Sequence, residues 1–352
     1  MRKIILLFIF TICLFGNSSD KELRNMIGQM IMVGFSGNNA NDEWVRQLRL
    51  DIKNGRIGGV MILARNISSK DGLKNLISYL NSARPKQPLF IAIDEEGGEI
   101  SRFNKFSDFE HFPSAYKVGN ELNLSSANKL YSKMAMQLKS LGVNMNFAPV
   151  VDLHNDISPI IGQRQRAFSS DASEVTAYAS EFISAFDNYS IASVLKHFPG
   201  HGNAAADTHK TKTIVDNFDF DEIRPYYELI KRKKAKFVMV GHMIIPVIDD
   251  TNPATLSYQV VTNLLKDSLA FEGVVISDDM LMKALGGTLE ENAIKAIKAG
   301  VDIVLVSEYF YNKTNSIKAV NDAIFNAVKS GQIEMTRIVD AYNRIIAQKA
   351  RF

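Results

Sequence analysis

Short apolar segments recur along the chain, and a polar or glycine-rich turn follows each of them. After each turn comes a stretch in which apolar residues recur roughly every three to four positions, the period of an α-helix. The short segments are rich in β-branched residues and apolar on both faces, which is typical of strands in a parallel sheet covered by helices. We predict eight such strands, at residues 30–35, 59–64, 88–94, 143–150, 192–197, 236–241, 273–277 and 302–306.

Eight strand–helix units in a chain of 352 residues predict an α/β fold, namely a closed (β/α)8 barrel of the TIM type. An open doubly wound sheet is the alternative, because the same alternation of strands and helices builds it. No linker of low complexity divides the chain, so we expect one catalytic domain over residues 19–352. Predicted helices lie at residues 71–83, 125–141, 173–188, 258–269, 289–299, 313–330 and 336–348.

The first 18 residues have the pattern of a secretory signal peptide. Arg2 and Lys3 precede an unbroken apolar run over residues 4–15, and small residues follow it. The run is too short to span a bilayer comfortably, although a buried N-terminal helix or a retained anchor would show a similar run. We therefore expect export to the periplasm or the medium, cleavage near Ser19 and no stable membrane insertion afterwards.

Composition narrows the chemistry that the exported chain can perform. Its one cysteine, Cys13, lies in the predicted signal peptide, so the remaining chain has no disulfide, thiol nucleophile or thiolate metal ligand. The formal net charge of +3 falls to +1 once Arg2 and Lys3 are removed. So small an excess of positive charge does not favour a nucleic-acid partner.

Nearly every predicted strand ends in an ionisable residue. In a TIM barrel these ends converge on the rim that holds the active site. Carboxylates that face cations and imidazoles in one pocket would suit a polar ligand, such as a sugar with many hydroxyl groups. The ionisable residues at these ends are Arg65, Asp94, Asp152, His154, Lys196, His197, His242, Asp278 and Asp279.

The segment 196–209 holds three of the six histidines of the chain, together with Lys196 and Asp207. Such a cluster could bind a metal ion, since His and Asp on barrel strands ligate zinc or iron in many hydrolases. Against a metal, the chain has no His-x-His pair on a strand and no His-Glu-x-x-His helix, and Lys196 adds positive charge where a cation would bind. We therefore predict a site without a metal or a cofactor.

Two motifs carry most of the information about function. The first is Lys-His-Phe-Pro-Gly-His-Gly at residues 196–202, followed by Asp-Thr-His at residues 207–209. The second is Ile-Ser-Asp-Asp-Met at residues 276–280. Because of these two motifs and several weaker matches, the chain resembles glycoside hydrolase family 3. It resembles more closely the single-domain β-N-acetylglucosaminidases of that family, which act on peptidoglycan fragments. The weaker matches lie at residues 65–66, 93–98, 102–103, 146–152, 161–168 and 241–243.

The resemblance implies a retaining glycosidase that forms a covalent glycosyl-enzyme. Asp278 is the implied nucleophile, and His209, oriented by Asp207, is the implied acid/base group. An imidazole exchanges protons near neutral pH, which suits that role. Arg164 and Arg166 compete for one sugar-binding position, and we favour Arg166. The predicted sugar contacts are Asp94, Arg102, Arg166, Lys196, His197, Arg65 and Met243.

The predicted function is hydrolysis of non-reducing terminal N-acetylglucosamine from peptidoglycan fragments by a monomeric enzyme. Phosphorolysis at the same site stays open, because an imidazole repels incoming phosphate less than a carboxylate does. The alternative that is not an enzyme is a catalytically silent protein that binds cell-wall sugars. Enzymes of this type that recycle the wall internally are generally cytoplasmic, so a cytoplasmic location is the alternative to export.

Overall fold

The computed structural model describes residues 20–83 and 86–351, and its centre is a parallel sheet of eight strands. Their order is β10-β1-β2-β3-β6-β7-β8-β9. The two end strands also meet, through a parallel bridge between Ile276 and Ile303, so the sheet closes into a barrel. This confirms the predicted (β/α)8 barrel. The strands are β1 (Ile31–Gly34), β2 (Gly59–Ile62), β3 (Phe90–Ile93), β6 (Met145–Asn146), β7 (Ala192–Phe198), β8 (Phe237–Val240), β9 (Val274–Ser277) and β10 (Val304–Val306).

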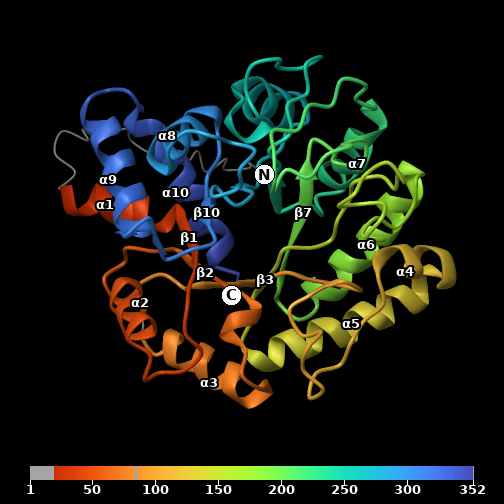
Figure 1. Cartoon of the computed structure of the whole chain (residues 1–352), viewed down its shortest axis with the longest axis horizontal. Helices are drawn as coiled ribbons and strands as arrows, with labels where there is room; N and C mark the ends of the chain where they lie inside the picture. Colours follow the sequence, from red (N-terminus) through yellow and green to blue (C-terminus); the bar gives the residue numbers. More distant parts are fainter. Residues whose placement is uncertain (1–19, 84–85, 352) are drawn as a thin grey trace, which may run out of the picture.

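Helices surround the strands on the outside of the barrel (Figure 1). Those predicted from the sequence agree with the observed ones to within three residues at each end. Among the described residues, no helix has the length and apolar character needed to cross a bilayer. The helices are α1 (Asp20–Gln29), α2 (Glu43–Lys53), α3 (Lys70–Asn81), α4 (Ala115–Glu121), α5 (Leu124–Leu141), α6 (Ala172–Asp187), α7 (Arg224–Lys231), the π-helix η4 (Gln259–Ser268), α8 (Leu289–Ala299), α9 (Ser316–Lys329) and α10 (Met335–Lys349).

Local sequence explains where several helices begin and end. Thr288 Oγ1 accepts the amide of Glu291 at 3.2 Å, and a Glu291 carboxylate oxygen accepts the amide of Thr288 at 3.2 Å, which satisfies two amides at the start of α8. Gly142 ends α5 with a φ of 90°, in the left-handed region that glycine tolerates best. The predicted signal peptide, residues 1–18, lies outside the described residues.

The fourth predicted strand, residues 143–150, is much shorter in the structure and covers only Met145–Asn146. Pro149 lacks an amide hydrogen for the sheet ladder. The ladder pairs Asn146 with Ile93 at the end of β3, and the Asn146 side chain extends this connection beyond β3: it accepts the amide of Glu95 at 3.0 Å and donates to the carbonyl of Glu95 at 2.8 Å. These bonds fix the chain directly after Asp94 at the rim.

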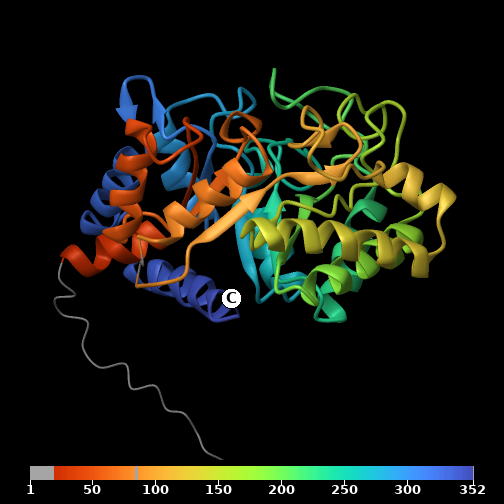
Figure 2. The same cartoon turned by 90° about the horizontal axis from the view of Figure 1, so that it is seen from below.

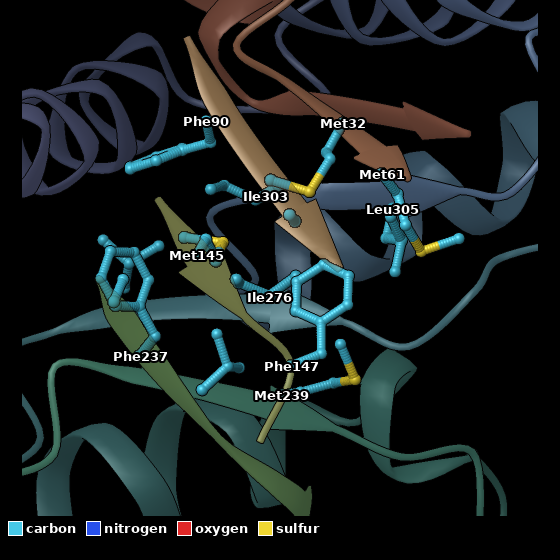
Figure 3. Packing of buried hydrophobic residues seen from close by; sticks show 14 of the residues in the cluster. Met32, Met61, Phe90, Met145, Phe147, Phe237, Met239, Ile276, Ile303 and Leu305 are labelled. Atoms are coloured by element: carbon cyan, nitrogen blue, oxygen red, sulfur yellow. The ribbon is translucent and has the colours of Figure 1, made fainter. Parts of the chain in front are cut away.

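Apolar side chains from strands on all sides fill the barrel interior (Figure 3). The rings of Phe90 and Phe237 meet edge to face with centroids 5.7 Å apart. Gly59 provides space beside them, because a Cβ atom there would lie 2.6 Å from Met32 Cε and 3.0 Å from Phe90 Cβ. Since the interior is a packed core and not a pore, we expect a ligand to bind at a rim.

Helix α10 lies across the amino-terminal end of the barrel (Figure 2, blue, beside the C-terminus). Arg344 Nη1 donates to the Gly273 carbonyl at 3.3 Å, just before β9, and Lys349 Nζ donates to the Gly58 carbonyl at 2.6 Å, just before β2. The opposite rim carries the loops that follow the carboxyl ends of the strands. The predicted site residues therefore lie on the rim away from α10.

Candidate active site

Five ionisable side chains at the ends of β3 and β7 and on nearby loops form one ion-pair network. Lys196 Nζ lies 2.9 Å from Asp94 Oδ1 and 2.6 Å from Glu96 Oε1. Arg102 Nη2 lies 2.5 Å from the other oxygen of Asp94. Arg166 forms two parallel bonds to Glu96, each 2.8 Å long. Four of the five were predicted as sugar contacts. Glu96 was not, although it lies in a motif that was recognised at residues 93–98.

The network keeps its carboxylates ionised. Burial would raise the pKa of Asp94, but the charges of Lys196 and Arg102 outweigh it and hold that pKa well below its usual range. Burial likewise opposes ionisation of Glu96, and Arg166 and Lys196 lower its pKa overall. The side chains of Asp94 and Arg102 remain 14% and 30% exposed. These two groups can therefore reach a ligand at the rim, as acceptor and donor.

Asp152, on the loop after β6, fixes the orientation of His197. Its carboxylate accepts the Nδ1–H of His197 at 2.7 Å and the backbone amides of His197 and His201, each at 2.9 Å. On the other side of the ring, Nε2 of His197 lies 3.4 Å from Arg166 Nη2. A guanidinium only donates, so Nε2 accepts there and the proton lies on Nδ1. Asp152 was noted at a strand end but was not predicted as a site residue.

Asp278 lies at the end of β9 and is held by the backbone. Its amide donates to the Val240 carbonyl at 3.0 Å, and its Oδ1 accepts the amide of Asp279 at 2.7 Å. Burial raises the pKa of Asp278, but the imidazoles of His242, His197 and His209 lower it by more. The group is therefore an ionised carboxylate, which is the state that a carboxylate nucleophile requires.

Asp279, the neighbour of Asp278, connects two loops. Its Oδ1 accepts the amide of Leu281 at 3.2 Å and that of Ser307, after β10, at 2.9 Å. Burial raises the pKa of Asp279 above its usual value, whereas the pKa of Asp278 lies below its usual value because the imidazoles outweigh burial there. The two adjacent aspartates therefore differ in environment, which agrees with assigning the chemistry to the first.

Asp207 and His209 meet on the long loop after β7. Asp207 Oδ1 lies 2.9 Å from His209 Nδ1 and also accepts the His209 amide at 2.9 Å. The His209 side chain is 62% exposed, whereas that of Asp207 is 15% exposed. Between them, the buried Thr208 anchors the loop: its Oγ1 lies 3.3 Å from His201 Nε2, and its carbonyl accepts the amide of Ala284 at 3.2 Å. The loop therefore extends from β7 to the segment that follows Asp278.

Two predicted sugar contacts do not join this cluster. Arg65 donates to the carbonyls of Phe35 and Ser307, each at 2.8 Å, and pairs with Glu308 at 2.9 Å, so it joins the loops after β1 and β10. The Met243 side chain is completely buried in a small apolar cluster. Of the two competing arginines, Arg166 lies in the network, whereas Arg164 is exposed and lines a different hollow of the surface, beside Glu99.

The carboxylates and imidazoles at this rim can act as acids, bases and nucleophiles. Within residues 20–83 and 86–351, no three His, Cys, Asp or Glu side chains gather in an arrangement that could hold a metal ion. The carboxylate of Asp278, directly after β9, lies within electrostatic range of His209, which is paired with the carboxylate of Asp207, and the ion-pair network lies at the same rim. That combination suits transfer of a glycosyl group with acid/base assistance.

Solved structures of known proteins share this architecture. A glycoside hydrolase family 3 β-N-acetylglucosaminidase of Paenibacillus sp. matches with a TM-score of 0.84 and 31% identity, over 94% of this chain and 62% of that chain. A β-N-acetylhexosaminidase of Beutenbergia cavernae matches with a TM-score of 0.83 and 28% identity, over 93% of this chain and 98% of that chain.

Sequence comparison agrees with the structural one. A β-hexosaminidase of Idiomarina loihiensis is 35% identical over 258 residues, which are 71% of this chain and 76% of that protein. One of Nitrosomonas eutropha is 32% identical over 305 residues, or 82% of this chain and 84% of that protein. The N-terminal domain of glycosyl hydrolase family 3 matches residues 22–348. The chain therefore belongs to glycosyl hydrolase family 3, and the prediction of a glycoside hydrolase is confirmed.

Proposed function

We propose that the protein is a retaining β-N-acetylhexosaminidase that releases non-reducing terminal N-acetylglucosamine from peptidoglycan fragments. One contact carries the proposal: the Ala284 amide, in the segment after Asp278, donates to the carbonyl of Thr208 at 3.2 Å. It joins the nucleophile's segment to the loop of the Asp207–His209 pair. The relatives named above supply the class of sugar, and the resemblance of the motifs supplies the peptidoglycan source.

In the first half of the reaction, the ionised Asp278 attacks the anomeric carbon of the sugar. His209 donates a proton to the glycosidic oxygen, the bond to the leaving group breaks, and an ester bond to Asp278 forms. Asp207 holds Nδ1 of His209, which leaves proton transfer to Nε2.

In the second half, His209 takes a proton from water, and the oxygen of that water attacks the anomeric carbon. Asp278 leaves as a carboxylate, and the two inversions give net retention of configuration. Asp94 and Arg102 bind sugar hydroxyl groups from the exposed side of the network. Lys196 and His197 lie deeper, behind these two groups.

The nucleophile can be tested with one pair of variants. Asp278→Asn removes the negative charge and should lower kcat on an aryl N-acetylglucosaminide by roughly a thousandfold or more. Asp267→Asn makes the same change at an exposed aspartate on η4 and should leave kcat unaltered. Full activity of the folded Asp278→Asn variant would exclude Asp278 as nucleophile.

Product analysis separates hydrolysis from phosphorolysis. Defined muropeptides are incubated with and without inorganic phosphate, and the products are identified by mass spectrometry. Hydrolysis gives free N-acetylglucosamine in both cases. Turnover that rises with phosphate and yields the sugar 1-phosphate would favour a phosphorylase, which the imidazole acid/base permits. Binding of the muropeptide without any product would instead indicate a catalytically silent wall-binding protein.

We also propose that the protein acts outside the cytoplasm as a monomer. The charged start and apolar run of the first 18 residues support export. Mass spectrometry of the N-terminus of protein from fractionated cells tests the cleavage near Ser19. Light scattering of the purified protein tests the monomer.

A further inference from the structure

A buried carboxyl group lies beneath the loop that carries the Asp207–His209 pair. It belongs to Glu222, on the short helix η2 (Phe220–Ile223), and Glu222 is 0% exposed. Its Oε2 accepts the amide of Leu153 at 3.0 Å. Because Leu153 directly follows Asp152, this bond ties η2 to the loop that orients His197.

Two glycines of the loop after β7 fit closely against Glu222. A Cβ atom on Gly200 would lie 2.3 Å from Glu222 Cβ, and one on Gly202 would lie 2.3 Å from Glu222 Oε1. Non-bonded atoms do not approach that closely, so the backbone can lie here only because glycine has no side chain. Glu222 therefore occupies the space between the loops after β6 and β7, with His201 between the two glycines.

The charges that act on Glu222 favour its neutral form. Burial raises its pKa well above the usual range, and the negative charges of Asp152 and Asp219 raise it further, against the opposing effect of two backbone amides. His201 supplies no compensating charge near neutral pH, since burial lowers its pKa to about 4. The other charged or titratable groups that interact with Asp152 and Glu222 include the cation of Arg166, His197 and Tyr226. Burial and the same two carboxyl groups raise the pKa of Tyr226.

Unpaired polar atoms in this region also favour a protonated carboxyl. Among the described residues, His201 Nδ1 and the Tyr226 hydroxyl are buried without a hydrogen-bond partner. A carboxylate can only accept hydrogen bonds, whereas a protonated carboxyl can also donate one. The neutral acid is therefore the form that this polar region can accommodate.

We propose that Glu222 is a positioning residue of the glycosidase, whose protonated carboxyl holds the Gly200–Gly202 segment against the loop after β6 and thereby places His209 beside Asp278. This proposal rests on the proposed function. The path to the acid/base group is short, because His201 Nε2 lies 3.3 Å from Thr208 Oγ1 and Thr208 precedes His209. Ionisation of Glu222 puts a second buried negative charge near Asp152, so it displaces the segment and lowers kcat.

Three variants test the proposal through the pH dependence of kcat and KM on an aryl N-acetylglucosaminide. Glu222→Ala empties the space and should lower kcat at pH 7 by about tenfold or more, with less change in KM, because a small misplacement of a catalytic group is costly. Glu222→Gln keeps the shape without a titrating proton, so it should retain most of kcat and lose part of the decline at alkaline pH. Glu228→Gln, on neighbouring α7, changes a partly exposed surface glutamate and should behave as the wild type.

A measurement without substrate keeps the test independent of the proposed function. Amide hydrogen exchange over residues 199–213 should be at least about tenfold faster in Glu222→Ala than in the wild type. If Glu222→Ala does not fold, Gly202→Ala should give the same faster exchange and lower kcat, because its added Cβ would lie 2.2 Å from the Leu153 carbonyl oxygen and 2.3 Å from Glu222 Oε1 and so would push the two loops apart at Glu222. A wild type without activity contradicts the proposed function alone.

Two results would overturn the role of Glu222. One is unchanged kcat and unchanged exchange of residues 199–213 in a folded Glu222→Ala variant. The other is a Glu222→Gln variant whose alkaline decline in kcat coincides with that of the wild type, because the proton of Glu222 would then have no part in placing the loop.

Discussion

Arg166 binds Glu96 through two parallel hydrogen bonds, Nε to Oε2 and Nη2 to Oε1, each 2.8 Å long. Its third nitrogen, Nη1, donates to the carbonyl of Ile160 at 3.0 Å, and Nη2 also faces His197 Nε2 at 3.4 Å. Every nitrogen of this guanidinium thus has a protein partner. Arg166 therefore organises Glu96 and His197 behind the groups that can reach the sugar.

Arg166→Lys tests this organising role. Lysine keeps the charge but cannot form two parallel bonds to a carboxylate. We expect kcat/KM to fall by roughly tenfold or more and the free energy of unfolding to fall by about 1–3 kcal/mol, because Glu96 loses a buried partner. Steady-state kinetics and thermal unfolding measure the two effects.

Arg164→Lys is the matched control, since Arg164 lies two residues away and is exposed. It should change neither kcat/KM nor the melting temperature. A larger loss of activity in Arg164→Lys than in Arg166→Lys would assign the sugar-binding position to Arg164 and contradict the choice made from the motif.

His209→Ala should affect poor leaving groups most. An alkyl aglycone needs a proton as its bond breaks, whereas a nitrophenolate leaves readily without one. We expect the loss in kcat/KM to be at least about tenfold greater for a methyl than for a nitrophenyl N-acetylglucosaminide. Asp216→Asn, an exposed change on the same loop, is the control. Equal losses on both substrates would remove His209 from the role of acid.

The barrel and half of the site could be predicted because strand ends are visible in the sequence. Lys196 and Asp278 each follow an apolar run, and parallel strands bring such residues to one rim. The sequence does not show in which direction a side chain points after its strand ends. Met243 follows His242 at the end of β8, yet it packs into an apolar cluster, and Arg65 turns toward the loops after β1 and β10.

The partners of the site residues were harder to predict, since each partnership is a tertiary contact. Asp152 meets His197 across 45 positions of sequence, and Glu96 meets Arg166 across 70. In the sequence, nothing distinguishes Glu222 from the nearby acidic residues Asp219 and Asp221. The burial of Glu222 depends on Gly200 and Gly202, which can pack against it because they have no side chains. That these two glycines lie against Glu222 becomes visible only in the folded structure.

Glu95→Gln should alter how stability depends on pH. Glu95 is buried beside the network, Ser101 Oγ donates to its Oε2 at 2.6 Å, and burial raises its pKa to about 8 from an ordinary value of 4.5. The folded state therefore binds this proton more tightly than the unfolded chain does, and the free energy of unfolding falls as the pH rises from 4.5 to about 8.

Glutamine has no such proton, so the stability of Glu95→Gln relative to the wild type should increase between pH 5 and pH 8 by roughly a few kcal/mol and stay level above that. Denaturant unfolding at several pH values measures it. Glu99→Gln is an exposed change on the turn between the short strands β4 (Glu95–Gly97) and β5 (Ile100–Ser101), and its stability relative to the wild type should not change with pH. If the stability difference between Glu95→Gln and the wild type also stayed constant with pH, Glu95 would have the same pKa in the folded and unfolded states.

Gly59→Ala should destabilise the barrel because its interior has no room for another carbon. The added Cβ would lie 2.6 Å from Met32 Cε, 3.0 Å from Phe90 Cβ and 3.2 Å from the Phe90 carbonyl oxygen. Figure 3 shows the side chains of Met32 and Phe90 in the packed interior. We expect the free energy of unfolding to fall by about 1–3 kcal/mol. Met32→Leu removes the atom nearest to the new carbon, so the double variant should lose less than the sum of the single changes. Additive losses in denaturant unfolding would mean that Phe90 and the backbone, which cannot move aside as a methionine end can, account for the whole effect.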